Sequence, residues 1–403
     1  MDFTGRNKAI DIIRALTMTL MIFVNDLWTI EYPKWLGHAG MNEDYLGLSD
    51  IVFPCFLFVV GMSIPYALEN AFKKGRTGVQ VASHILTRTL ALIVMGIMLQ
   101  NTGNIAPEVG IAKPVYKLLV LASFFLIWNI YPRTENKNRR LLYKVLKYVG
   151  VALLIFMIVI YVDPKGNLIR AGWWGILGLI GWTYLVCAFI YYFVRTDLKK
   201  LILMWAIFLV WSMLRCKLTA SGEPLLNIPQ NNALYTVTDQ ILNIGTGAHG
   251  ALTMGGIILS VTELKLRDKK IPFVAFTTIV AAILALGALI TNNFWIISKI
   301  QATAPWVLYS SAIAVFLYGV IVWLVSKGKA SWFKFIAPAG EATLTCYLVP
   351  TILGNIFMLF GISQIRPEWC HSGFLGILSC IIFSLVCVGL TWCMNKLYLK
   401  LKV

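Results

Sequence analysis

A histidine, an asparagine and two aspartates cluster near the start of the chain. Asn25 and Asp26 lie at the end of a long apolar segment, His38 lies in the loop PKWLGHAGMNEDYLGLSD, and Asp50 opens the next apolar segment. Histidine, with a pKa near neutrality, is the commonest general base in enzymes. Polar groups at bilayer depth cost a few kcal/mol each unless they are paired or used. The pattern predicts a functional site centred on His38.

Two of these residues also have structural interpretations. Gly37 and Gly40 flank His38 and would allow a ligand to approach the backbone closely. Alternatively, His38 is an interfacial loop histidine without a chemical role. Asp50 follows Ser49 at an expected helix start, where a carboxylate commonly caps the backbone. Capping the helix and orienting His38 are compatible roles for Asp50.

Basic residues and a second histidine lie elsewhere in the apolar segments. Asp11 and Arg14 are three residues apart, which puts them on one helix face and favours an ion pair. Alternatively, Arg14 and Arg88 bind an anionic ligand, since guanidinium matches phosphate geometry. His249 either lines a cavity opposite His38 or bridges helices through hydrogen bonds.

Composition indicates a membrane protein. The chain of 403 residues is 59% hydrophobic and 13% charged, about half the charged content of an average soluble domain. Because spans need about 20 apolar residues, we predict an all-α, polytopic integral membrane helix bundle of about twelve helices (10–12), forming a single domain over residues 1–403. The expected spans are 9–30, 50–72, 82–101, 113–131, 144–162, 173–194, 199–215, 237–261, 272–292, 302–326, 335–360 and 374–396.

The net charge of +17 reflects topology rather than nucleic-acid binding. Lys and Arg residues concentrate in alternate loops of the predicted bundle, and the positive-inside rule places those loops and both termini in the cytoplasm. No cleavable signal peptide is evident, so we expect a multi-pass protein of a bacterial inner membrane. The 8 cysteines form no CxxC pair and no metal-ligand spacing, so we expect packing residues and no metal site.

Residues 7–70 resemble a known family. The motifs DIIRALTMTLMIFVN, GHAG and LSDIVFPCFLFVVGMSIPYAL are similar to segments of the membrane-bound heparan-α-glucosaminide N-acetyltransferases, particularly to bacterial relatives that lack the lumenal N-terminal domain. The later resemblance is weaker: Gly178 and Leu179 stand where the family usually has Gln-Arg, and Ala342 stands where Asn is expected.

The resemblance implies an acetyltransferase. Acetyl-CoA would come from the cytoplasm and an amino sugar would accept the acetyl group on the other side, with a homodimer as the assembly. By position, His38 is the implied catalytic histidine and Asn25 a nearby polar group that could stabilise an oxyanion. Asp50 or Asp26 would hold the imidazole tautomer, and Arg14 and Arg88 would meet the CoA phosphates. His38 acts either as a general base or as a transient acetyl carrier.

Two other functions fit parts of the sequence. A secondary transporter of sugars or amino sugars would also have about twelve spans, broken helices and acidic residues within the membrane. However, the chain shows no twofold internal similarity, and its polar residues concentrate at one end. A partner subunit of an envelope-polysaccharide system, without chemistry of its own, is the third alternative.

Overall fold

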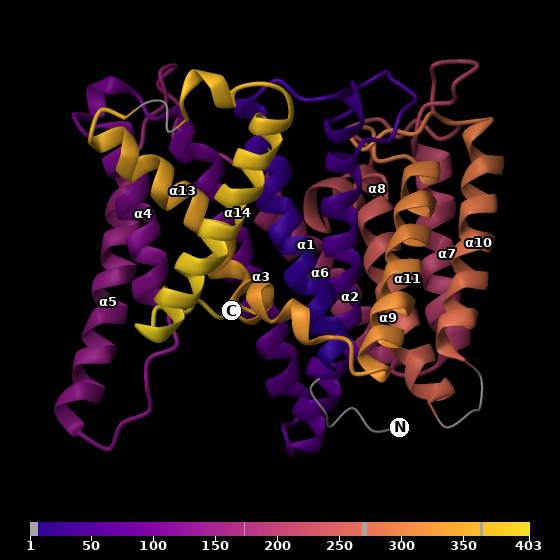
Figure 1. Ribbon diagram of the computed structural model, residues 1–403, viewed down its shortest axis with the longest axis horizontal. Coiled ribbons are helices and arrows are strands. Elements are labelled where there is room, and N and C mark those ends of the chain that lie inside the picture. Colours follow the sequence, from indigo (N-terminus) through magenta and orange to yellow (C-terminus); the bar gives the residue numbers. More distant parts are fainter. Residues whose placement is uncertain (1–6, 173, 268–271, 363–365) are drawn as a thin grey trace. The chain divides into compact units, whose positions relative to one another are not determined.

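The chain folds into helices. The computed structural model describes residues 7–172, 174–267, 272–362 and 366–403, so residue 173 of one predicted span lies outside the described residues. Over these ranges the regular elements are helices, with two isolated β-bridges. The predicted all-α, polytopic membrane fold is therefore confirmed (Figure 1).

Seven helices within the described residues are long and apolar enough to cross a membrane, or up to eight if one broken pair counts as a span. The number of about twelve is thus not confirmed. The other long helices are shorter or more polar. For example, α4 (Lys113–Trp128) has 16 residues, roughly 24 Å at 1.5 Å per residue, less than the ~30 Å hydrocarbon core. The seven are α2 (Leu48–Lys73), α3 with η3 (Gly78–Asn104), α5 (Lys137–Val159), α6 (Gly175–Val194), α10 (Phe273–Asn292), α11 (Ala304–Ser326) and α14 (Gly373–Lys396).

The helices group into two compact units, which interrupt one another along the chain. Unit 1 comprises Met1–Trp28, Tyr32–Leu86 and Trp182–Ala337, and unit 2 comprises Thr29–Glu31, Thr87–Gly181 and Pro338–Val403. Helices α3 and α6 each contribute residues to both units. The single functional domain expected from the sequence stays a prediction.

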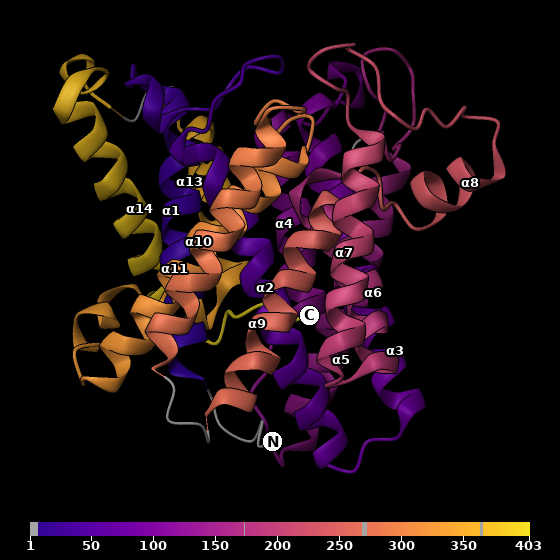
Figure 2. The same ribbon diagram turned by 90° about the vertical axis from the view of Figure 1, so that its right-hand side faces the viewer.

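Unit 1 is built around α2. Its further helices are α1 (Lys8–Asp26), α7 (Leu198–Arg215), the short α8 (Ala233–Tyr235), the π-helix η5 (Thr236–Ile241), α9 (Ala248–Leu266), α10, α11 and η6 (Ser331–Ile336). Helix α2 contacts α1, α9 and α11, and α10 packs along α11. Figure 2 shows α10 beside α11, and α8 in the long connection between α7 and α9.

Two glycines, Gly61 on α2 and Gly256 on α9, allow the backbones of these helices to lie close together. A Cβ on Gly256 would lie 1.9 Å from the carbonyl oxygen of Phe58, and one on Gly61 would lie 2.0 Å from that of Thr253. Any larger residue at either position would force the backbones apart. Close packing of α2 against α9 therefore requires glycine at positions 61 and 256.

A partly buried network of polar side chains connects helices of unit 1 near the start of α1. Asn7 caps α1 by accepting from the backbone N–H groups of Ala9 and Ile10. Its side-chain amide lies 3.0 Å from the Tyr318 hydroxyl and 3.2 Å from the Glu263 carboxylate. Because Asn7, Glu263 and Tyr318 come from α1, α9 and α11, this network ties three helices together.

Unit 2 contains most of α3, then α4, α5, the start of α6, α13 (Thr343–Leu359) and α14. Its short helical segments include η3 (Thr102–Asn104), η4 (Pro107–Val109), η7 (Glu368–Cys370) and all but the first residue of α12 (Ala337–Glu341). Helix α4 packs against both α5 and α13, and α13 packs against α14. Residue Ala342 separates α12 from α13, so the predicted span 335–360 is broken in the structure.

Candidate functional site

The imidazole of His38 lies against the carboxylate of Asp50. Its Nδ1 is 2.6 Å from Asp50 Oδ1, a short hydrogen bond between a loop side chain and the first turn of α2. The carboxylate is 2% exposed, whereas the His38 side chain is 24% exposed. An imidazole that donates Nδ1–H to a buried carboxylate keeps its Nε2 lone pair available to accept a proton.

Local backbone geometry fixes the position of Asp50. The carboxylate also accepts from the N–H of Ala39 at 2.9 Å and from that of Gly47, the N-cap residue of α2, at 3.3 Å. The loop folds tightly against the start of the helix, because a Cβ on Gly47 would lie 2.0 Å from the Gly37 carbonyl oxygen. Both roles predicted for Asp50 are therefore present in its contacts: it caps α2 and it holds His38.

Two further residues at this site, Lys299 and Trp306, are more than 250 positions away in the sequence. Lys299, in the connection between α10 and α11, places its Nζ 3.3 Å from His38 Nδ1 and 3.2 Å from the Ser49 carbonyl oxygen. Trp306, in the first turn of α11, is fully buried and donates its indole N–H to the Asp50 carbonyl oxygen at 2.9 Å. Sequence reasoning had assigned neither residue to the site.

Lys299 brings a positive charge to the pair. Burial lowers the pKa of Lys299 below its ordinary value of 10.5, and the nearby Asp50 carboxylate partly opposes this effect. The imidazole is thus flanked by the carboxylate of Asp50 and the ammonium group of Lys299. In the sequence, Lys299 is a single lysine between the predicted spans 272–292 and 302–326, and nothing there connects it with His38.

An exposed tryptophan borders the imidazole. The Trp28 ring centroid is 5.9 Å from that of His38, at an interplanar angle of 39°, and Trp28 is 68% exposed. It follows directly on Leu27, after the end of α1 at Asp26. The exposed ring forms an aromatic surface beside the candidate base.

Asn25 and Asp26 occupy the last two positions of α1, just before Trp28. Asn25 is exposed and Asp26 is half-buried. Chain connectivity thus places both at the end of α1 that carries Trp28. Their predicted roles, as an oxyanion donor and as an orienting acid, stay predictions.

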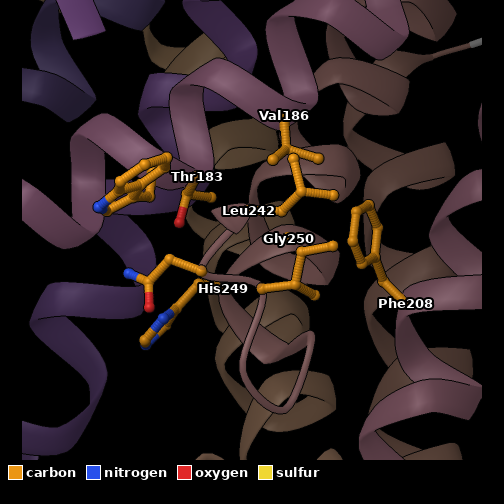
Figure 3. A pocket seen from close by; sticks show the side chains of 9 residues that line it. Thr183, Val186, Phe208, Leu242, His249 and Gly250 are labelled. Atoms are coloured by element: carbon orange, nitrogen blue, oxygen red, sulfur yellow. The ribbon is translucent and has the colours of Figure 1, made fainter. Parts of the chain in front are cut away.

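His249 lies deeper in unit 1, at the start of α9. Its ring makes edge contacts with Trp306 and Phe53, at centroid distances of 6.3 and 5.7 Å. Trp306 therefore lies between His249 and the backbone of Asp50. His249 also lines a cavity of about 10 Å³ with Thr183, Val186, Phe208, Leu242 and Gly250, among other residues, shown in Figure 3. This cavity has room for about one water molecule.

The two arginines that were expected to bind an anion lie in different units. Arg14 pairs with Asp11 at 3.1 Å, which confirms the predicted ion pair, and its other terminal nitrogen donates to Ser63 Oγ at 2.7 Å. Arg14 lies twelve residues before Asp26 on α1, roughly 18 Å along the helix. Arg88 lies in the stretch of α3 that belongs to unit 2. Their predicted role in binding CoA phosphates stays a prediction.

Within the described residues, no group of three or more His, Cys, Asp or Glu side chains is arranged so that it could hold a metal ion.

Fold and site together define a polytopic helical membrane protein with a candidate acid–base centre. Comparison with known proteins adds a family resemblance over one segment. Residues 6–108 match the family model described as heparan-alpha-glucosaminide N-acetyltransferase, catalytic, and this segment contains Arg14, Asn25, His38, Asp50 and Arg88. The family resemblance predicted from the sequence is thereby confirmed over this segment.

Two curated relatives carry the same name. Heparan-alpha-glucosaminide N-acetyltransferase of Mus musculus is 29% identical over 101 residues, and that of Homo sapiens is 29% identical over 100 residues. Each alignment covers 24% of this chain and 14% of the relative. The chain thus spans only a small part of the length of these relatives.

Proposed function

We propose that the chain is a membrane acetyltransferase that moves an acetyl group from acetyl-CoA to the amino group of a glucosamine-type sugar. The observation that carries the proposal is the short contact between His38 and the buried Asp50, within the segment that matches an N-acetyltransferase family. Acetyl transfer to an amine needs a base at the acceptor nitrogen, and an imidazole held by a carboxylate fits that role.

In the proposed reaction, His38 Nε2 removes a proton from the sugar amine as its nitrogen attacks the thioester carbonyl. The C–S bond then breaks, the acetyl group stays on nitrogen as an amide, and the CoA thiolate takes the proton from the imidazolium. Asp50 holds the tautomer and stabilises the imidazolium. Asn25 serves as the hydrogen-bond donor to the tetrahedral oxyanion, and Asp26 adds a second carboxylate at the same helix end.

Donor binding is assigned to residues away from the imidazole. Arg14, Arg88 and His249 are our candidates for contacts to acetyl-CoA, the two arginines for its phosphates. Arg14 lies toward the opposite end of α1 from Trp28, which supports an elongated donor that reaches His38 from the other end of unit 1.

The proposed topology follows the charge distribution. Acetyl-CoA enters from the cytoplasm and the sugar binds on the extracytoplasmic side. Both termini are cytoplasmic. The bacterial inner membrane and the homodimer in this proposal come from the family resemblance, not from the charge distribution.

The direct test is acetyl-CoA turnover by detergent-purified protein with glucosamine as acceptor. We compare wild type with His38→Ala, and with His371→Ala, which removes a half-buried loop histidine. The proposal expects acceptor-dependent CoA release that is lost only in His38→Ala. No CoA binding and no release with any amino sugar would overturn it, and sugar transport would then be measured in proteoliposomes.

A second measurement separates the two roles of His38. Protein mixed with acetyl-labelled CoA without acceptor is quenched and examined for protein-bound label. Direct transfer expects no label, whereas an acetyl carrier would hold up to one acetyl group on His38. Label that is found in wild type and lost in His38→Ala would replace the direct mechanism.

A further inference from the structure

Unit 2 contains a polar cavity that the proposed acetyl transfer does not use. Its volume is about 240 Å³, and helices α3, α4, α6 and α13 and the short η3 line it. At roughly 30 Å³ per water, it has room for about eight water molecules. Its lining residues are Gly96, Leu99, Gln100, Thr102, Lys117, Gly175, Ile176, Leu177, Tyr347 and Thr351.

Three polar side chains of this cavity come from separate helices, whereas the lining residue Thr102 donates its hydroxyl to the Leu99 carbonyl oxygen. Lys117 lies on α4, Gln100 on α3 and Tyr347 on α13. None of the three makes a side-chain hydrogen bond or ion pair with the residues that the structure describes. Partly buried polar groups are normally satisfied by protein, water or ligand, so these three side chains are available to bind a ligand in the cavity.

The charge of the side chains that line the cavity favours an anionic ligand. Lys117 supplies a positive charge, no acidic residue lines the cavity, and hydroxyl and amide groups supply neutral donors. Leu99, Ile176 and Leu177 add an apolar wall that suits the carbon atoms of an ester. A lysine with neutral donors around it is a common arrangement for binding phosphate.

We propose that this cavity binds the phosphate group of a small phosphate ester, supplied either by a phospholipid head or by a soluble metabolite. Lys117 pairs with the phosphate oxygens, and the Tyr347 hydroxyl and the Gln100 amide donate to them. Three polar groups from three helices that meet around one cavity carry this inference, which is independent of acetyl transfer.

The experiment uses delipidated full-length protein in neutral detergent. Native mass spectrometry measures binding of phosphatidylglycerol, and a thermal shift titration measures binding of glycerol 3-phosphate. The variants are Lys117→Gln and Tyr347→Phe, which removes only a hydroxyl. The matched control is Lys113→Gln, which makes the same charge change at an exposed residue one turn earlier on α4.

We expect one probe to bind wild type with an affinity about tenfold lower in Lys117→Gln, as for a lost charge-assisted contact. Tyr347→Phe should weaken binding about threefold, and Lys113→Gln should leave it unchanged. Binding of the lipid or of the soluble ester identifies the source. The inference is overturned if neither probe binds, or if Lys113→Gln weakens binding as much as Lys117→Gln. If Lys117→Gln does not fold, unchanged binding in Tyr347→Phe overturns it.

Discussion

The Nζ of Lys299 lies 3.3 Å from Nδ1 of His38, the ring nitrogen that also lies 2.6 Å from Asp50. A single ring nitrogen cannot donate its proton to the carboxylate and at the same time accept one from the ammonium group. Lys299 instead has a geometric acceptor in the Ser49 carbonyl oxygen at 3.2 Å. Its effect on His38 is therefore electrostatic, and it opposes that of Asp50.

The first prediction concerns Asp50. Replacing it in Asp50→Asn keeps the size of the side chain but removes the charge that fixes the imidazole tautomer. We expect kcat for acetyl transfer to fall about 10²-fold or more, within the range of general acid–base catalysis. Glu43→Gln, in the same loop but exposed, is the control. Equal turnover of wild type and Asp50→Asn would show that the contact does not serve catalysis.

The second prediction is a pair of opposite effects on turnover at one fixed pH. Lys299→Met removes a positive charge beside the imidazole, so the positive charge that His38 gains in the proposed proton transfer is less strongly repelled and kcat should rise. Asp50→Asn removes the neighbouring negative charge, so kcat should fall. Lys34→Met, which changes an exposed lysine in the His38 loop, should leave kcat unchanged. Changes of kcat in the same direction for Lys299→Met and Asp50→Asn would contradict the electrostatic role.

The third prediction uses the lowered pKa of Lys299. Burial puts its pKa in the folded protein below the ordinary 10.5. Between these two values the unfolded chain binds more protons at this residue, so its contribution to stability rises with pH. The difference in melting temperature, wild type minus Lys299→Met, should increase as the pH rises from 7 toward 10. A constant difference between the two proteins across this range would argue against the buried charge.

The fourth prediction assigns Trp28 to acceptor binding. Its ring is largely exposed and lies beside His38, so it offers an apolar face to the sugar ring. Trp28→Ala should raise KM for the amino sugar about tenfold and leave KM for acetyl-CoA unchanged. Trp35→Ala, at an exposed tryptophan of the same loop, is the matched control. Equal effects of both variants on acceptor KM would point to a shared interfacial role instead.

The fifth prediction tests the backbone that supports the pair. Gly47→Ala would place a Cβ 2.0 Å from the Gly37 carbonyl oxygen, whereas Gly40→Ala meets its nearest atom at 3.7 Å. Gly47→Ala should destabilise the protein by about 1–3 kcal/mol, as overpacking does, and should lower turnover by displacing the His38 loop. Thermal unfolding and turnover are measured for both variants. The prediction is wrong if the two behave alike.

Much of the site could be predicted from a short stretch of sequence. Polar residues within apolar segments, a glycine-flanked histidine and an aspartate at a helix start all occur between positions 25 and 50. These are local signals: capping and loop geometry act between residues that are close in sequence. The contact between His38 and Asp50, twelve positions apart, follows from them because Gly47 starts α2 directly against the loop.

Only the tertiary structure could supply the rest. Lys299 and Trp306 lie 261 and 256 positions from their partners His38 and Asp50, and no local pattern distinguishes them from other residues at the ends of spans. The division into two units, and the cavity that four helices of unit 2 share, were likewise not visible in the sequence. Hydropathy determines that a segment is helical and apolar, but side-chain packing between distant segments decides which residues meet.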